Sequence, residues 1–255
     1  MSPRQVCVVT GSSKGIGAAT ARLYASRGWS VVINCSRDLA PADAVAAQCR
    51  ALGVDALVVQ GDVASDADCR RLAAEVEAHF GRADVLVNNA GTTRFAPLKD
   101  LDALQAEDFQ RIYGVNVIGA YQMSRALAPL LQRQPGAGIV NVSSIASMMG
   151  MVSSLAYMAS KGALNALTIG LARALGPQIR VNAVAPGLVE TEWLQQGLGA
   201  ERYAEAVAGY KARAALDAVI SPEDVAEAAW WLGAGAAKTT GEILLLDAGL
   251  RLTRG

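Results

Sequence analysis

The chain has 255 residues, of which 52% are hydrophobic and 18% are charged, and its formal net charge at pH 7 is zero. This composition excludes an intrinsically disordered protein, because so many apolar residues can bury a large core. The chain has no basic block and no apolar run near the roughly 20 residues that span a bilayer, so we expect neither a nucleic-acid partner nor a membrane protein.

Short apolar runs alternate with longer segments of helical periodicity along the chain. Strands are expected at residues 5–10, 30–34, 56–59, 84–89, 138–144, 178–187 and 242–247. Helices are expected at residues 16–27, 42–52, 65–80, 101–113, 115–132, 154–175, 201–211 and 222–232. The strand segments are continuous in Val, Ile and Leu, which is typical of a parallel sheet buried on both faces. The pattern predicts an α/β fold in which residues 1–255 form one doubly wound (Rossmann) domain with helices on both faces of the sheet.

The segment VVTGSSKGIG places a glycine-rich turn between the first expected strand and the first expected helix. Glycine allows unusual backbone angles and close approach to a pyrophosphate, and a helix N-terminus offers free N–H groups and a positive dipole end. The same glycines could form a merely tight turn, but their place in the first βα unit favours a dinucleotide site. The expected cofactor contacts in this turn are Gly11, Ser13, Lys14, Gly15, Ile16 and Gly17.

The end of the second expected strand indicates which dinucleotide is bound. A carboxylate there accepts the ribose 2′-hydroxyl of NAD, whereas a cation accommodates the 2′-phosphate of NADP. Cys35 and Ser36 stand where the acid would be expected, Arg37 follows them, and Lys14 lies in the glycine turn. We interpret Asp38 as the start of the next helix. The sequence therefore favours NADP(H) over NAD(H), with Ser36 and Arg37 among the contacts.

Cysteine and histidine usage limits the remaining chemistry. The four cysteines are Cys7, Cys35, Cys49 and Cys69. They include no Cys-x-x-Cys pair, so we expect no zinc or other metal site and interpret them as small buried hydrophobes or surface thiols. The single histidine, His79, ends a helical segment, where a cap or surface role is expected. Apart from His79, nothing could carry Ser-His-Asp chemistry, so an enzyme would take its acid–base group from another residue type. The apolar part of the N-terminal segment is too short for a signal peptide, and we expect a cytoplasmic protein.

Over nearly its whole length the chain resembles the short-chain dehydrogenase/reductase family. The motifs that carry the resemblance are TGSSKGIG (10–17), GDV (61–63), NNAG (88–91), VN (115–116), NVSS (141–144), YMASK (157–161) and APG (185–187), with Thr191 beyond. Each motif alone is weak, whereas the set in this order is specific. Within the family, NNAGTTR and PGLVET are most similar to the group of 3-oxoacyl-carrier-protein reductases.

The resemblance implies a catalytic set of Asn116, Ser144, Tyr157 and Lys161. Tyr157 matches the catalytic tyrosine and Lys161 its partner; Ser144, which fits the spacing better than Ser143, matches the serine that holds the substrate carbonyl. Asn116 matches an asparagine that supports a water-linked proton path. The further cofactor contacts that the resemblance implies are Asp62 and Val63 at the adenine, Asn89, Ala90 and Gly91 at the ribose, Tyr157 and Lys161, and Pro186, Gly187, Val189 and Thr191 near the nicotinamide.

The chemistry of these residues suits hydride transfer. Positions i and i+4 share one face of a helix, so the Tyr157 phenol and the Lys161 ammonium can act together. A tyrosine has a pKa of about 10, and a nearby ammonium is expected to lower it toward the working range. Ser144 can donate a hydrogen bond to the negative charge that develops on a carbonyl oxygen. The structural alternatives are that Asn116 caps a helix and that Ser144 satisfies a strand end.

Several alternatives concern the substrate. The leading hypothesis is an NADP(H)-dependent reduction of a carbonyl or oxidation of a secondary alcohol, with a 3-oxoacyl thioester-like compound as one candidate substrate. The alternatives are a sugar, polyol or cyclic-alcohol dehydrogenase and a nucleotide-sensing regulator without catalysis. Met148, Met149 and Met151 follow Ser144 where similar reductases carry small residues, and either a pocket or a core role is open to them. The segment near 188–211 is expected to cover the substrate.

The helical segments at 101–132 and 154–175 carry more apolar residues than one face of a sheet can cover. Together with the family resemblance, this surplus predicts a homotetramer with these helices at an interface. The only other partner expected is a small-molecule substrate.

Overall fold

The computed structural model describes residues 4–150 and 153–252, and within them the strands form one parallel sheet. Its seven strands lie in the order β3-β2-β1-β4-β5-β6-β7. The strands are β1 (Val6–Val9), β2 (Ser30–Cys35), β3 (Ala56–Gln60), β4 (Val85–Asn88), β5 (Gly138–Val142), β6 (Arg180–Pro186) and β7 (Ile243–Leu246). Each neighbouring pair is parallel. The expected doubly wound sheet is therefore confirmed, and its order reverses between β1 and β4, where such folds bind ligands.

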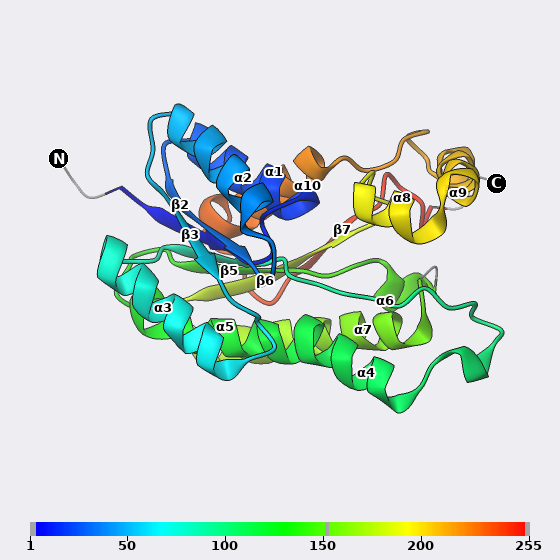
Figure 1. The fold of residues 1–255 in the computed structure, drawn as a ribbon, viewed down its shortest axis with the longest axis horizontal. Helices are drawn as coiled ribbons and strands as arrows, with labels where there is room; N and C mark the ends of the chain where they lie inside the picture. Colours follow the sequence, from blue (N-terminus) through cyan, green and yellow to red (C-terminus); the bar gives the residue numbers. More distant parts are fainter. Residues whose placement is uncertain (1–3, 151–152, 253–255) are drawn as a thin grey trace.

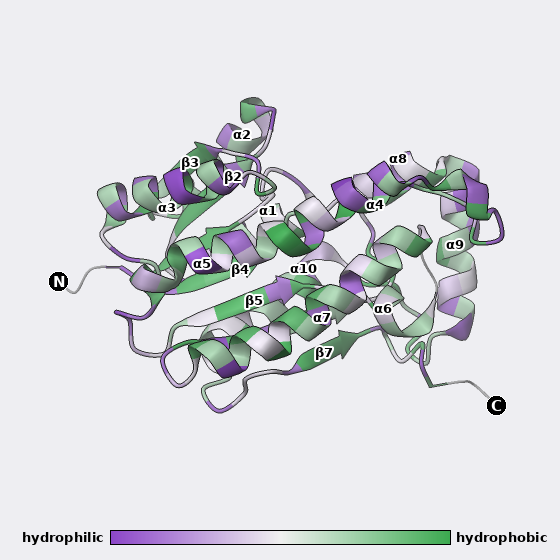
Figure 2. Ribbon diagram, turned by 90° about the horizontal axis from the view of Figure 1, so that it is seen from below, coloured by the Kyte–Doolittle hydropathy of each residue, from purple (hydrophilic) through white to green (hydrophobic). Residues whose placement is uncertain are grey.

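Helices cover the sheet in two layers (Figure 1). One layer contains α1 (Gly15–Ser26), α2 (Leu39–Ala51) and α10 (Pro222–Trp230). The other contains α3 (Asp66–Phe80), α4 (Ala106–Tyr113), α5 (Ala120–Leu131) and α7 (Leu155–Leu175). The buried apolar residues form two clusters, one against each face of the sheet. In Figure 2 the strands are largely apolar, whereas the helices carry both apolar and hydrophilic residues, as expected for elements that face the sheet on one side.

Local capping explains where several helices begin and end. Ser65 precedes α3 and accepts a hydrogen bond from the Asp68 amide, and Gly81 ends the helix in the left-handed region, with φ of 68°. Ser154 caps α7 by accepting from the Tyr157 amide. Such caps satisfy backbone groups that the helix itself cannot pair. The capping of α7 fixes the position of Tyr157 in its first turn.

The region 101–132 differs from the expected pair of helices. A short 3-10 turn, η1 (Leu101–Ala103), comes first, and the chain then extends before α4. Gln105 and Asp108 form a reciprocal capping box that starts α4 anew. A π-helical segment, η2 (Gly114–Gly119), then joins α4 to α5 without a gap. Helical periodicity alone could not separate these pieces, because each of them is helical over a few residues.

Shorter helical elements were also absent from the sequence-based expectation. They are α6 (Ala146–Met149), α8 (Glu192–Leu198) and a π-helical segment after α10, η3 (Trp231–Gly235). The expected helix at 201–211 is α9 (Ala200–Arg213). None of the described helices is long and apolar enough to cross a membrane.

The cysteines and the histidine lie as expected. All four cysteines are free and buried, and His79 is an exposed residue of the last turn of α3 whose ring nitrogen lies 2.8 Å from the Asp55 carboxylate. Among the residues described, no cluster of His, Cys, Asp and Glu side chains could hold a metal ion. Asp38 caps α2 by accepting from the Ala40 amide, which confirms that it starts that helix.

Candidate active site

The glycine turn after β1 packs directly against the chain after β4. A Cβ on Gly11 would lie 2.9 Å from the Ala90 Cα, and one on Gly17 would lie 2.5 Å from the Asn89 amide nitrogen. The Asn89 side chain donates to the carbonyls of Thr10 and Gly11, at 2.9 Å each. Only glycine fits at these positions, and the contact brings two of the expected cofactor segments together at the carboxyl edge of the sheet.

The first turn of α1 is left without a side-chain cap. Lys14 occupies the N-cap position and makes no capping hydrogen bond, unlike the capping residues of α2, α3 and α7. The neighbouring Ser12 hydroxyl is used elsewhere, because it donates to the Val9 carbonyl and accepts from the Asn34 amide. The free amides of α1 therefore suit a pyrophosphate, and the residues of this turn fit a dinucleotide. Ser13 and Ile16 lie in the same turn and are partly exposed.

Two cations, one in the glycine turn and one after β2, lie in the segments where the 2′ position of a ribose is expected. Lys14 and Arg37 are exposed, and within the described residues neither side chain has a hydrogen bond or an ion pair. The Arg37 carbonyl accepts from the Gln60 side chain at 2.8 Å, which fixes the loop after β2. Asp38 is engaged with its own helix. Ser36 is exposed, whereas the Cys35 side chain belongs to the buried core, so only Ser36 faces outward at the end of β2.

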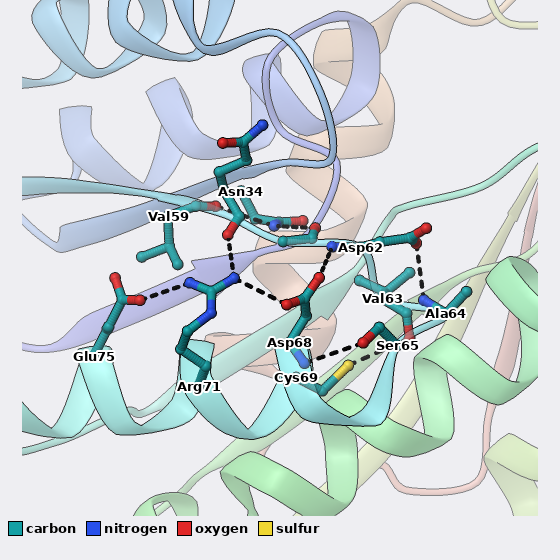
Figure 3. Close-up of polar contacts among 12 residues, drawn as sticks. Asn34, Val59, Asp62, Val63, Ala64, Ser65, Asp68, Cys69, Arg71 and Glu75 are labelled. Atoms are coloured by element: carbon teal, nitrogen blue, oxygen red, sulfur yellow. Dashed lines mark hydrogen bonds and ion pairs between the residues drawn. The ribbon is translucent and has the colours of Figure 1, made fainter.

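The loop after β3, with Asp62 and Val63, is held by α3 (Figure 3). The Asp62 amide donates to the Asp68 carboxylate at 2.9 Å, and the Asp62 carboxylate accepts from the Ala64 amide at 3.0 Å. Arg71 donates to Asp68 at 3.1 Å and to the Gln60 carbonyl at 2.7 Å. The backbone donor at Asp62, followed by Arg71, lowers the pKa of Asp68. These hydrogen bonds between α3 and the loop were not predicted from the sequence, although the i,i+3 spacing of Asp68 and Arg71 is typical of a helical ion pair.

Ser144, Tyr157 and Lys161 come together at the end of β5 and the start of α7. Tyr157 receives a hydrogen bond from Ser144. The Lys161 ammonium lies 5.5 Å from the centre of the Tyr157 ring and donates to the Val142 carbonyl at 2.7 Å. Ser143 points elsewhere, since its hydroxyl donates to the Asn165 side chain at 2.6 Å. The geometry therefore agrees with the choice of Ser144 over Ser143.

Asn116 lies in η2 and is almost completely buried. Its side-chain oxygen accepts from the Thr92 amide at 2.8 Å, and its side-chain nitrogen donates to the Thr92 carbonyl and the Ser160 hydroxyl, at 3.0 Å each. These bonds tie the π-helical segment to the loop after Gly91 and to α7. A Cβ on Gly91 would lie 3.9 Å from the Lys161 ammonium, so the ribose segment and the lysine also meet here.

The loop after β6 closes the other side of the site. The Pro186 carbonyl accepts from the Ile145 amide at 3.0 Å, which joins this loop to the segment after Ser144. Val189 forms a parallel bridge with Ile220. Thr191 caps α8, and its methyl group would lie 3.5 Å from a Cβ on Gly15. The expected nicotinamide segment and the glycine turn are therefore neighbours.

Residues 5–202 match the family model for short chain dehydrogenases. The chain belongs to the short-chain dehydrogenase family. It is 44% identical over 247 residues to ketoacyl reductase 2 of the granaticin polyketide synthase of Streptomyces violaceoruber, with 97% of this chain and 96% of that protein covered. It is 35% identical over 249 residues to a 3-oxoacyl-[acyl-carrier-protein] reductase of Synechocystis, with 96% of each covered. The crystal structure of a short-chain dehydrogenase/reductase from Burkholderia xenovorans superimposes with a TM-score of 0.91 at 43% identity, covering 99% of this chain and 100% of that one.

Membership of the short-chain dehydrogenase family makes this protein an oxidoreductase that acts on CH–OH or C=O groups of a small molecule with NAD(P). It decides against a nucleotide-sensing regulator without catalysis. The relatives also confirm the resemblance to the reductases of 3-oxoacyl groups that the motifs indicated.

The ionisation of the central pair differs from the sequence-based expectation. Burial raises the pKa of Tyr157 to about 12, and the hydrogen bond from Ser144 only partly opposes this. Burial lowers the pKa of Lys161 to about 8. The pKa of the phenol in this structure is therefore raised, not lowered toward the working range as the sequence led us to expect, because burial disfavours the charged phenolate. The phenol is therefore protonated at neutral pH.

One aromatic residue that was not expected from the sequence, Trp193, borders the Tyr157 ring, and a second, Phe95, packs against Trp193. The ring centre of Trp193, on α8, lies 6.5 Å from that of Tyr157 and 5.7 Å from that of Phe95. Their only signal in the sequence was the position of Trp193 inside the segment expected to cover the substrate. Of the methionines considered for a pocket, Met148 is exposed, Met149 packs against the core, and Met151 lies outside the described residues.

Proposed function

We propose that this short-chain dehydrogenase uses NADPH to reduce the ketone of a 3-oxoacyl thioester-like substrate to a secondary alcohol. The observation that carries the proposal is the convergence of Ser144 and Lys161 on the protonated phenol of Tyr157. The likeness to proteins named as ketoacyl and 3-oxoacyl reductases supports the substrate class.

Each side chain has a physical task in this reaction. Ser144 and the Tyr157 hydroxyl hold the substrate oxygen between them, and Tyr157 gives it a proton as negative charge develops. A pKa of about 12 keeps the proton on Tyr157 until that charge forms. Lys161, which is charged below its pKa of about 8, stabilises the phenolate left behind and can hold the nicotinamide ribose. The cofactor supplies the hydride when it is bound.

The remaining cofactor residues have positioning tasks. The glycine turn with the first amides of α1 would hold the pyrophosphate, and the loop at Asp62 and Val63 would meet the adenine. Val189 and Thr191 would hold the nicotinamide carboxamide. Lys14 and Arg37 would bind the 2′-phosphate, and their lack of other partners supports NADP(H) over NAD(H).

Both amide protons of the Asn116 side chain are donated, to Thr92 and Ser160, and its oxygen accepts from the Thr92 amide. A water-linked proton path at this residue would therefore use its backbone or the second lone pair of that oxygen. The side chain contributes by holding η2 against α7, and so by fixing the surroundings of Lys161.

NADPH consumption tests the proposed function directly. Absorbance at the NADPH band is followed with 3-oxoacyl thioesters of N-acetylcysteamine and, in the reverse direction with NADP⁺, with sugars, polyols and cyclic alcohols. We expect turnover of the 3-oxoacyl thioesters. Turnover confined to the sugars or polyols would replace the proposal with the dehydrogenase alternative, and NADPH binding without turnover of any compound would refute both.

A further inference from the structure

Helices α8 and α9 lie beyond the carboxyl end of the sheet, apart from both helix layers (Figure 1). α9 is anchored there by Tyr210, which is buried and donates to the Asp247 carbonyl at 2.7 Å. Its hydroxyl also occupies the space beside Gly187, where a Cβ would lie 1.9 Å from it. By contrast, α8 contributes no buried residue. α9 is therefore anchored by a buried side chain, whereas α8 lies on the surface.

The ring contacts of α8 are made with residues of the active site. Trp193 is 47% exposed and neighbours both Tyr157 and Phe95. At the other end of the helix, a Cβ on Gly197 would lie 2.0 Å from the Phe95 ring, so that ring lies directly against the helix backbone. Trp193 therefore lies beside the Tyr157 ring while nearly half of its own surface is exposed to solvent.

Phe95 is fixed to the helix that carries Tyr157. The Ala96 amide donates to the Ser153 carbonyl at 2.8 Å, and the hydroxyls of Thr93 and Ser153 lie 2.6 Å apart. Ser153 directly precedes the residue that caps α7. The loop that carries Phe95 is therefore tied to the start of α7, whereas Trp193 is carried by the surface helix α8.

We propose that Trp193 and Phe95 form an aromatic clamp that binds the apolar group attached to the substrate's carbonyl carbon and favours rings there over a methyl group. This inference rests on the proposed function, because a carbonyl oxygen held by Tyr157 places its neighbouring group beside Trp193. Aromatic faces and edges pack best against other rings, and a substrate ring covers the exposed part of Trp193. The clamp also excludes water from the phenol during proton transfer.

The test compares three esters that differ only in the group beside the ketone: ethyl acetoacetate with methyl, ethyl benzoylacetate with phenyl, and ethyl 3-cyclohexyl-3-oxopropanoate with a saturated ring. Trp193→Ala should lower kcat/KM for both ring-bearing esters by about tenfold or more, mainly through KM, and change the methyl ester by less than about threefold. Taking each variant's ratio to the wild type cancels the intrinsic reactivity of each ketone. Trp231→Ala is the matched control, because Trp231 is 48% exposed and lies in η3.

NADPH affinity is measured for every variant and should stay within about threefold of the wild type, since neither Trp193 nor Phe95 is among the expected cofactor contacts. Phe95→Leu provides a second test on the other ring of the clamp and should show the same loss for the ring-bearing esters. Equal losses for all three esters, or no loss in either variant, would overturn the clamp while leaving the reductase intact. A wild type that binds NADPH and reduces none of the esters or thioesters would refute the proposed function and the clamp together.

Discussion

We expect the proposed preference for NADPH to be reversible by substitutions at the end of β2. Ser36 is the first outward-facing residue there, whereas Cys35 packs in the core. A carboxylate meant to face the ribose is therefore introduced at position 36. Ser36→Asp combined with Arg37→Ala should move the preference from NADPH to NADH. The new carboxylate repels a 2′-phosphate and accepts the 2′-hydroxyl of NAD, and the change at Arg37 removes a cation that attracts the phosphate.

The size of the expected preference for NADPH follows from the solvent exposure of Lys14 and Arg37. A charge-assisted hydrogen bond is worth roughly 1.5–3 kcal/mol, and exposure to solvent favours the lower end. Each cation then contributes about tenfold, so Lys14 and Arg37 together predict a preference of about a hundredfold for NADPH in kcat/KM. In the double variant, the loss of Arg37 should lower the preference for NADPH by about tenfold, and repulsion by the new carboxylate should lower it further. The kcat/KM for NADH should then be at least as high as that for NADPH.

The assay measures kcat/KM for both cofactors with one ketone, at low and at high ionic strength. Salt should shrink the wild-type preference, because it screens exposed charges. Lys238→Ala is the matched control, since Lys238 is an exposed cation in the loop before β7. The reasoning fails if the wild type uses NADH as well as NADPH at equal, sub-saturating concentrations, or if the double variant keeps the wild-type ratio.

Three further predictions concern the catalytic pair and the assembly. Tyr157→Phe should leave NADPH binding nearly unchanged and reduce turnover by roughly 10²–10⁴-fold. Lys161→Ala should weaken both NADPH binding, measured by fluorescence titration, and turnover, measured in steady-state assays. A Tyr157→Phe variant that keeps most of its activity would refute the acid role of Tyr157. The pKa of Lys161 falls from 10.5 to about 8 on folding, so between these values the unfolded chain holds a proton that the folded chain has released. Denaturant titrations should therefore show the free energy of unfolding of the wild type, measured relative to Lys161→Met, rising from about pH 8 to about pH 10; a flat difference would contradict the burial of the lysine. Exposed apolar side chains on the outer layer, Phe109, Ile118, Tyr121 and Ile169, support the expected homotetramer, and light scattering that found a stable monomer at micromolar concentration would count against it.

The sequence by itself determined the layout of the sheet and the positions of the polar motifs. Continuous runs such as VCVV and VLVN are local signals for buried parallel strands, and the spacing of the glycines between the first strand and the first helix is a local signal for the turn. Ser65 and Asp38 indicate helix starts, because their side chains can accept hydrogen bonds from the first backbone amides of a helix. These features depend on a few consecutive residues, which is why a single sequence is sufficient to predict them.

Tertiary structure decided what depends on contacts between distant residues. Burial set the direction of the Tyr157 pKa, and the capping box at Gln105 and Asp108 divided an apparently continuous helix. Phe95 and Trp193 are far apart in the chain, yet their rings lie 5.7 Å apart, and the Trp193 ring also neighbours Tyr157. Packing fixes such distances and the solvent exposure of each group, and no local pattern of residue types encodes either quantity.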